Sequence, residues 1–266
     1  MKITFIGGGA MGEAMLSAIL DNNLSSPQDI TVSDINETRL QHLKQKYGVN
    51  VTSNNRQAVA AGEIVILAIK PQNLVEVMAE LNSHLQPSQL VVSIIAGARI
   101  NTLCLGLNHN CVVRVMPNTP AQIGMGMSVW TSTAEVTDEQ KKQAGAILGA
   151  MGKEIYVDNE QYLDMVTAVS GSGPAYIFLF VESLIDAAIE IGLPQNVAEE
   201  LVLQTLLGSG YLIQKSDRTP AELRRMVTSP GGTTAEALLK LEEGGFHDLI
   251  KQAVMAAYHK AQRLGG

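Results

Sequence analysis

The stretch Ile3-Thr4-Phe5-Ile6-Gly7-Gly8-Gly9-Ala10-Met11-Gly12 decides the fold. Its first four residues predict a short strand, and the glycines that follow fit the pattern G-x-G-x-x-G. Glycines in that pattern permit a tight turn and a close approach of the backbone to a pyrophosphate, which binds at the start of the next helix. A helix is expected over 14–20 and a second strand over 30–33, so the sequence predicts a βαβ unit that binds a dinucleotide.

The same alternation of short apolar strands and helices continues through the first half of the chain. Further strands are expected over 64–69, 90–95 and 111–115, and helices over 38–47, 74–85 and 139–151. This order predicts a parallel, doubly wound sheet that extends to about residue 130.

Helices dominate the second half of the chain. They are expected over 162–169, 175–191, 197–214, 219–226 and 234–264. We therefore expect a dinucleotide-binding Rossmann domain at 1–160 and an all-helical domain at 161–266. The apolar helices leave more hydrophobic surface than one small domain can cover, which predicts a homo-oligomer.

Charge and composition exclude several partners. The net charge is −7 and the basic residues are scattered, so no nucleic-acid surface is expected. Two isolated cysteines suggest reduced, mostly buried thiols and a cytoplasmic location. The apolar run 175–193 carries Glu182, Asp186 and Glu190 on one helix face, which indicates a soluble amphipathic helix and no membrane partner.

The end of the second strand bears on the choice of cofactor. Asp34 lies about 20 residues after the glycines, where an acid bonds the ribose 2′-hydroxyl of NAD. Ser33, Asn36 and Arg39 lie close by and would accept the 2′-phosphate of NADP if Asp34 turned away. The sequence leaves both cofactors open.

Two further segments fall at the carboxyl edge of the sheet, where cofactors bind. Lys70 follows the third predicted strand, where it either contacts the cofactor or is a solvated surface lysine. Ala96-Gly97 follows the fourth, where small residues either let the backbone approach a nicotinamide or serve packing alone.

The segment Ser229-Pro230-Gly231-Gly232-Thr233-Thr234 interrupts the helical half with glycines and hydroxyls. A helix follows it, so its backbone N–H groups suit a small anion such as a carboxylate. The alternative is simple capping, because Thr233 with Glu236 fits a capping box.

Five segments together resemble the pyrroline-5-carboxylate reductase family, nearly from end to end of the chain. They are residues 5–11, 68–71, 114–120, 170–176 and 229–234. The resemblance implies reduction of the cyclic imine of 1-pyrroline-5-carboxylate to L-proline, the last step of proline biosynthesis, by hydride transfer from NADPH or NADH. It also implies intertwined homodimers formed through the helical domain, sometimes assembled into decamers.

The resemblance assigns roles to residues. Thr234 would bond the ring nitrogen and act in catalysis, beside substrate contacts from Ser229, Gly231, Gly232 and Thr233. Asp217 would reach a neighbouring subunit's substrate amine. The residues expected to bind the cofactor are Ile6, Gly7, Gly8, Gly9, Ala10, Met11, Gly12, Ser33, Asp34, Asn55, Ala68, Ile69, Lys70, Pro71, Ala96 and Gly97.

Arg114 and Asn118 have two alternative roles in the sequence. Either they serve the substrate side of the site, or Arg114 fixes the loop 117–120 and Asn118 is structural within it. The sequence does not separate these roles.

Two other functions compete with imine reduction. A related hydroxyacid dehydrogenase would need a lysine base, but the segment 171–176 is followed by Ile177. A dinucleotide-binding regulator without turnover would have no use for a second anion site. The five histidines lack a partner motif and are expected to be solvated, and no metal site is expected.

Overall fold

The computed structural model describes residues 1–265, which form two compact units: Met1–Ser172 with the C-terminal segment from Ala257, and Gly173–Ala256. The first unit is built on one eight-stranded sheet with strand order β3-β2-β1-β4-β5-β6-β7-β8. The strands are β1 Ile3–Ile6, β2 Ile30–Ser33, β3 Asn50–Thr52, β4 Ile64–Leu67, β5 Leu90–Ser93, β6 Val112–Met116, β7 Gly126–Ser132 and β8 Gly152–Tyr156.

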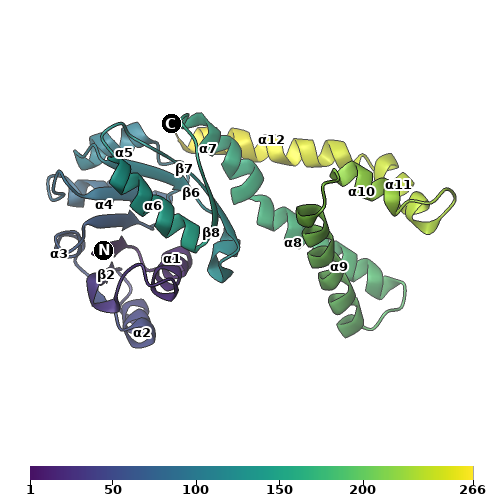
Figure 1. Ribbon diagram of the computed structural model, residues 1–266, viewed down its shortest axis with the longest axis horizontal. Helices are drawn as coiled ribbons and strands as arrows, with labels where there is room; N and C mark the ends of the chain where they lie inside the picture. Colours follow the sequence, from purple (N-terminus) through teal and green to yellow (C-terminus); the bar gives the residue numbers. More distant parts are fainter. Residues whose placement is uncertain (266) are drawn as a thin grey trace. The chain divides into compact units, whose positions relative to one another are not determined.

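Helices cover both faces of this sheet (Figure 1). One face packs against α1 (Ala10–Asp21), α2 (Glu37–Tyr47) and α6 (Asp138–Ala150). The other face packs against α3 (Asn55–Val59), α4 (Leu74–Leu81) and α5 (Ile100–Leu107). The four central strands β1, β4, β5 and β6 are buried along almost their whole length, as expected for a sheet with two covered faces. The predicted Rossmann fold is confirmed.

The sheet is parallel from β1 to β6, as predicted, and departs from this only at its far edge, beyond the last predicted strand. β7 pairs antiparallel with β6, and β8 then pairs parallel with β7. The connection from β6 to β7, residues 117–125, is shorter than the dozen or so residues that a parallel crossover needs. The strands β3, β7 and β8 were not predicted, and the exposed edge sequence of β8, Gly-Lys-Glu-Ile-Tyr, has little apolar character.

A continuous helical stretch connects the two units. It begins with α7 (Gln161–Val166), passes through a π-helical turn at Thr167–Gly171 and continues as α8 (Gly173–Glu190). In that turn the N–H of Ser172 donates to the carbonyl of Thr167 over 2.8 Å. Single π turns of this kind occur frequently at functional sites.

The second unit is helical, as predicted. Its remaining helices are α9 (Gln195–Lys215), α10 (Pro220–Met226), α11 (Thr233–Glu243) and the first part of α12 (Phe246–Leu264). The single helix expected over 234–264 is therefore wrong. Gly244 ends α11, and Gly245, with a φ of +67°, turns the chain into α12.

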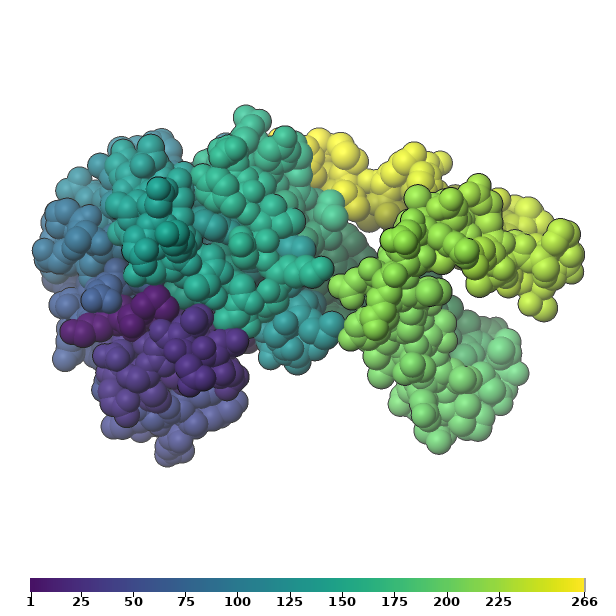
Figure 2. Space-filling model, in the orientation of Figure 1, coloured from purple at the N-terminus to yellow at the C-terminus, as the bar shows by residue number. Residues whose placement is uncertain are grey.

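The helices of the second unit leave much of their apolar surface open. Phe178 and Leu179 on α8 are 63% and 64% exposed, and Leu201 on α9 is 53% exposed. In Figure 2 the residues of these helices, coloured in shades of green, form part of the visible surface. Within the described residues, the helical stretch Gln161–Glu190 is also long and apolar enough to cross a membrane by length and composition alone.

Two expectations about polar groups need correction. The free thiols of Cys104 and Cys111 are half-buried rather than buried, and burial raises the pKa of both. His109 is buried, contrary to the expectation of solvated histidines, and its Nε2 lies 2.8 Å from the carbonyl oxygen of Gln89. Both observations indicate structural roles.

Candidate active site

The turn between β1 and α1 requires glycine at two places. Gly7 has a φ of +102°, and a Cβ atom on it would lie 2.6 Å from the carbonyl oxygen of Ala68. A Cβ atom on Gly12 would lie 2.7 Å from the carbonyl oxygen of Gly7. These glycines let the turn fold tightly against the end of β4.

Gly9 differs from the other glycines of the turn. A Cβ atom on it would have no neighbour within 4 Å, so the backbone faces open space. Gly9 is also the N-cap of α1 and provides no side-chain cap for the N–H groups of the first turn. A helix start with open space before it fits a pyrophosphate, which these N–H groups and the helix dipole attract.

A cavity of about 710 Å³ lies at the carboxyl edge of the sheet, at the switch point between β1 and β4. Ligands bind at this place in doubly wound folds. Most residues expected to bind the cofactor line it: Ile6, Gly7, Gly9, Ala10, Met11, Ser33, Asp34, Asn55, Ala68, Ile69, Lys70, Pro71 and Ala96.

Three expected cofactor residues do not line this cavity. The N–H of Gly8 donates to Oδ2 of Asp34 over 2.7 Å, and Gly12 is buried in α1. Gly97, with a φ of +78°, packs against the backbone of Leu264 at the end of α12. Gly8 therefore positions a residue of the site, while Gly12 and Gly97 serve packing.

Other residues line the cavity that the sequence did not assign to the cofactor. They are Ile35, Asn73, Glu76, Val77, Glu80, Ile94, Ile95, Met116, Pro117, Asn118, Thr119, Gln122 and Gly171. Five of them fall in segments that carried a signal, 114–120 and 170–176, and the others lie outside any motif. Glu80 is tied to the predicted site, since the amide nitrogen of Asn55 donates to it over 2.7 Å and the Ser33 hydroxyl donates to Asn55 over 2.7 Å.

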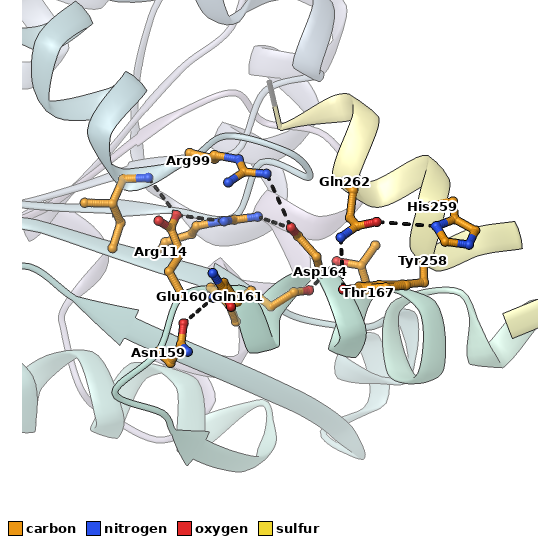
Figure 3. Close-up of polar contacts among 12 residues, drawn as sticks. Arg99, Arg114, Asn159, Glu160, Gln161, Asp164, Thr167, Tyr258, His259 and Gln262 are labelled. Atoms are coloured by element: carbon orange, nitrogen blue, oxygen red, sulfur yellow. Dashed lines mark hydrogen bonds and ion pairs between the residues drawn. The ribbon is translucent and has the colours of Figure 1, made fainter. Parts of the chain in front are cut away.

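Arg114 makes contacts that fit neither of the two roles that the sequence left open, the substrate side of the site and the loop 117–120. It lies buried on β6, where its guanidinium donates to Glu160 over 2.7 Å and to Asp164 over 3.2 Å, as Figure 3 shows. Oε1 of Glu160 also accepts from the N–H of Ile100 over 2.7 Å. Arg114 thus fixes the start of α7 to the sheet rather than the loop 117–120.

Asn118 joins the cavity wall to the π-helical turn. Its side-chain oxygen accepts from the N–H of Met127 over 2.9 Å, and its amide nitrogen donates to the hydroxyl of Ser170 over 3.2 Å. The residue lines the cavity as well, so its structural contacts hold a side chain at the cavity wall.

The segment 229–234 lies in the second unit and forms a compact turn before α11. The N–H of Gly232 donates to the carbonyl of Ser229 over 3.0 Å, and Gly231 has a φ of +68°. The expected capping box of Thr233 with Glu236 is wrong, because Gly232 is the N-cap and no side chain caps the helix. Thr234 is half-buried at the second position of α11, and Asp217 lies exposed between α9 and α10.

The absence of a side-chain cap matters for anion binding. The N–H groups of the first turn of any helix have no acceptor within the helix. A carboxylate at the start of α11 would satisfy them and interact favourably with the helix dipole. The geometry of the segment therefore suits the anion site that the sequence suggested.

Known proteins resemble this chain over its full length. The pyrroline-5-carboxylate reductase of Synechocystis is 39% identical over 265 residues, which cover 100% of this chain and 98% of that protein. The chain belongs to the pyrroline-5-carboxylate reductase family. A member from Escherichia coli is 35% identical and covers 99% of this chain and 98% of its own.

Two family models match separate parts of this pyrroline-5-carboxylate reductase family member. The model described as pyrroline-5-carboxylate reductase dimerisation matches residues 160–264. The model described as NADP oxidoreductase coenzyme F420-dependent matches residues 2–97.

Solved structures of pyrroline-5-carboxylate reductases share the fold. The Plasmodium falciparum enzyme, solved with NADP bound, is 33% identical with a TM-score of 0.92 and covers 100% of this chain and 98% of its own. The Coxiella burnetii enzyme is 36% identical with a TM-score of 0.90 and the same coverage. A prephenate dehydrogenase from Aquifex aeolicus, 15% identical with a TM-score of 0.55, shares the fold alone.

Proposed function

We propose that this chain reduces 1-pyrroline-5-carboxylate to L-proline with a nicotinamide dinucleotide: it accepts NADP(H), the cofactor solved with the Plasmodium falciparum relative, and also NAD(H). The observation that supports this most strongly is the open space before Gly9 at the start of α1, in a chain that belongs to the pyrroline-5-carboxylate reductase family along its whole length. When bound, the reduced dinucleotide supplies the hydride that adds to the C=N carbon.

The first unit holds and orients the dinucleotide. The glycine turn and the uncapped start of α1 take the pyrophosphate, and the lining residues Lys70 and Ala96 lie at the ends of β4 and β5. Asn118 lines the same cavity and is fixed through Ser170. These groups form a rigid wall that limits the positions a bound ring can take.

The segment 229–234 and Thr234 act on the substrate. The backbone N–H groups at the start of α11 bind the carboxylate, with Ser229, Gly231, Gly232 and Thr233 around it, and the Thr234 hydroxyl orients the ring nitrogen. Aligning hydride donor and imine lowers the barrier by several kcal/mol, on the order of the 7–11 kcal/mol seen in well-oriented reactions. The donor hydroxyl adds less, because an imine nitrogen takes a proton readily.

We also propose an assembly and a location. The match to the dimerisation model and the exposed apolar residues of α8 and α9 support a homodimer formed through the helical part, with residues 1–160 and 161–266 as the two domains. In this proposal Asp217 reaches the substrate of the neighbouring subunit, dimers assemble further into decamers, and a second subunit rather than a membrane covers α8. The net charge of −7 and the free thiols fit the cytoplasm.

One assay tests the function against its rivals. Oxidation of NADPH and NADH is followed by absorbance with 1-pyrroline-5-carboxylate and, in parallel, with 2-keto acids. We expect oxidation with the imine alone. Activity with keto acids only would favour a hydroxyacid dehydrogenase, and binding of the dinucleotide without any turnover would favour a regulator.

A further inference from the structure

Asp34 occupies a fixed position at the ribose end of the cavity. Oδ2 accepts the N–H of Gly8 over 2.7 Å, and Oδ1 accepts the N–H of Asn36 over 2.9 Å. Both oxygens therefore bond backbone groups on either side of the site, and the carboxylate lines the cavity. A carboxylate held in this way can accept a further hydrogen bond from a ribose 2′-hydroxyl, but it repels a 2′-phosphate.

Arg39, the basic residue that the sequence offered for a 2′-phosphate, already has partners inside the protein. The Arg39 guanidinium donates to the carbonyl oxygen of Gly8 and forms an ion pair with Glu13. Glu13 is itself held by Lys46 and by the hydroxyl of Tyr47, each over 2.9 Å. Arg39 is thus bonded to the glycine turn and to Glu13, and it is not among the residues that line the cavity.

Asn36 and Ser33, the other groups that the sequence offered for a 2′-phosphate, are also engaged. The side chain of Asn36 accepts the N–H of Arg39 over 3.1 Å as the cap of α2. The hydroxyl of Ser33 donates to Asn55. Both side chains already form hydrogen bonds inside the protein.

The charged residues that line the cavity also disfavour a 2′-phosphate. Among the described residues that line it, Lys70 is the only basic one, whereas Asp34, Glu76 and Glu80 are acidic. Lys70 follows β4, two strands from β2, which corresponds to about 10 Å across a sheet. A single lysine at that distance cannot offset the carboxylate of Asp34 beside a 2′-phosphate.

We propose that Asp34, together with the engagement of Arg39 by Glu13, makes this chain bind NADH more tightly than NADPH. This inference rests on the proposed function only in that the cavity holds a nicotinamide dinucleotide.

Isothermal titration of the full-length protein with NADH and with NADPH, without substrate, tests the proposal. We expect the wild-type dissociation constant for NADH to be at least ten-fold lower than that for NADPH. The Asp34→Ser variant should lose most of this ratio or reverse it. The double variant Asp34→Ser with Glu13→Gln should bind NADPH more tightly than Asp34→Ser alone, because Arg39 is released.

Two further variants keep the test specific. Asp34→Asn retains an acceptor for Gly8 and removes only the charge, so it replaces Asp34→Ser if that variant does not fold. Glu37→Gln removes an exposed carboxylate on the same segment, outside the cavity lining, and should leave the wild-type ratio unchanged.

The outcomes separate this inference from the proposed function. Equal or tighter binding of NADPH by the wild type overturns the inference, and so does a ratio that Asp34→Asn and Asp34→Ser leave unchanged. Binding of either nucleotide without imine reduction contradicts the proposed function and leaves the preference measurable.

Discussion

Arg114 on β6 and Asp164 on α7 form a buried ion pair, with 3.2 Å between the guanidinium nitrogen and the carboxylate oxygen. They lie 50 positions apart in the chain, and Glu160 and Arg99 complete the cluster around them (Figure 3). The pair fixes α7 to the strand β6.

Replacement of Arg114 by leucine should lower the free energy of unfolding by about 3–5 kcal/mol, because it removes the shorter of the two ion pairs of the buried Asp164 carboxylate and leaves only the contact with Arg99. Urea denaturation measures the change. The control is Lys240→Met, which removes the exposed pair with Glu243 and should cost at most about 1 kcal/mol. Equal losses in the two variants would contradict a structural role for the buried cluster.

Two glycines of the first turn should respond differently to alanine. Gly7→Ala should lower the free energy of unfolding by about 2 kcal/mol or more, because its φ is positive and the new Cβ meets the Ala68 carbonyl. Gly9→Ala should cost no more than about 1 kcal/mol, since its φ of −64° suits alanine and nothing lies within 4 Å.

Among folded variants, we expect Gly9→Ala to lose more affinity for the dinucleotide than Gly7→Ala, the reverse of their order in stability. The methyl group of Gly9→Ala occupies the space proposed for the pyrophosphate, so we expect at least a ten-fold loss of affinity by isothermal titration. Unchanged affinity in Gly9→Ala would remove the start of α1 from the proposed site.

Replacement of Thr234 by alanine should lower kcat by about 10- to 100-fold without abolishing turnover, since one hydroxyl donor is lost while alignment remains. Steady-state kinetics with 1-pyrroline-5-carboxylate measure it. Thr219→Ala is the matched control in the same unit: it breaks the capping box with Glu222 and should cost about 1 kcal/mol of stability without changing kcat. Wild-type kcat in Thr234→Ala would exclude the residue from the mechanism.

Because of Glu13, the free energy of unfolding should depend on pH under acidic conditions. Burial opposes its ionisation, but hydrogen bonds from Lys46, Arg39 and Tyr47 outweigh this and lower the pKa of Glu13 from 4.5 to about 2. Because the pKa is lower in the folded state, the stabilisation is complete above about pH 4.5 and is lost as the pH falls toward 2.

Comparison of wild type with Glu13→Gln measures this contribution. We expect a difference of about 1–2 kcal/mol near pH 6, reduced from the full linkage value because solvent screens Lys46 and the nearby His42. The difference should shrink between pH 4.5 and 2. A difference that does not change over this range would show that the ion pairs contribute nothing to stability.

The exposed apolar helices should control assembly. Leu201→Glu on α9 places a charge on a surface that is 53% exposed in the single chain, and we expect it to shift the oligomer toward the 28.4 kDa monomer. Light scattering during size-exclusion chromatography measures the mass. Glu200→Gln, next to it on the same helix, should leave the mass unchanged, and an unchanged mass in both variants would place the interface elsewhere.

Much of the site was predictable because it depends on local sequence. The glycine turn, the acid after β2 and the segment 68–71 each follow a strand, and parallel strands bring their ends to one edge of the sheet. The residues that sequence reasoning missed, such as Glu80 and Gln122, come from helices that reach the same edge only after the chain has folded.

The sequence by itself determined the βαβ start, the alternation of strands and helices followed by a helical half, the family and the segment suited to a carboxylate, because short-range periodicity, glycine geometry and motif spacing carry them. Only the tertiary structure decided the antiparallel direction of β7, the partners of Arg114 and the engagement of Arg39 by Glu13. These features depend on ion pairs and strand pairings between residues far apart in the chain, and such contacts leave no periodic trace in the sequence.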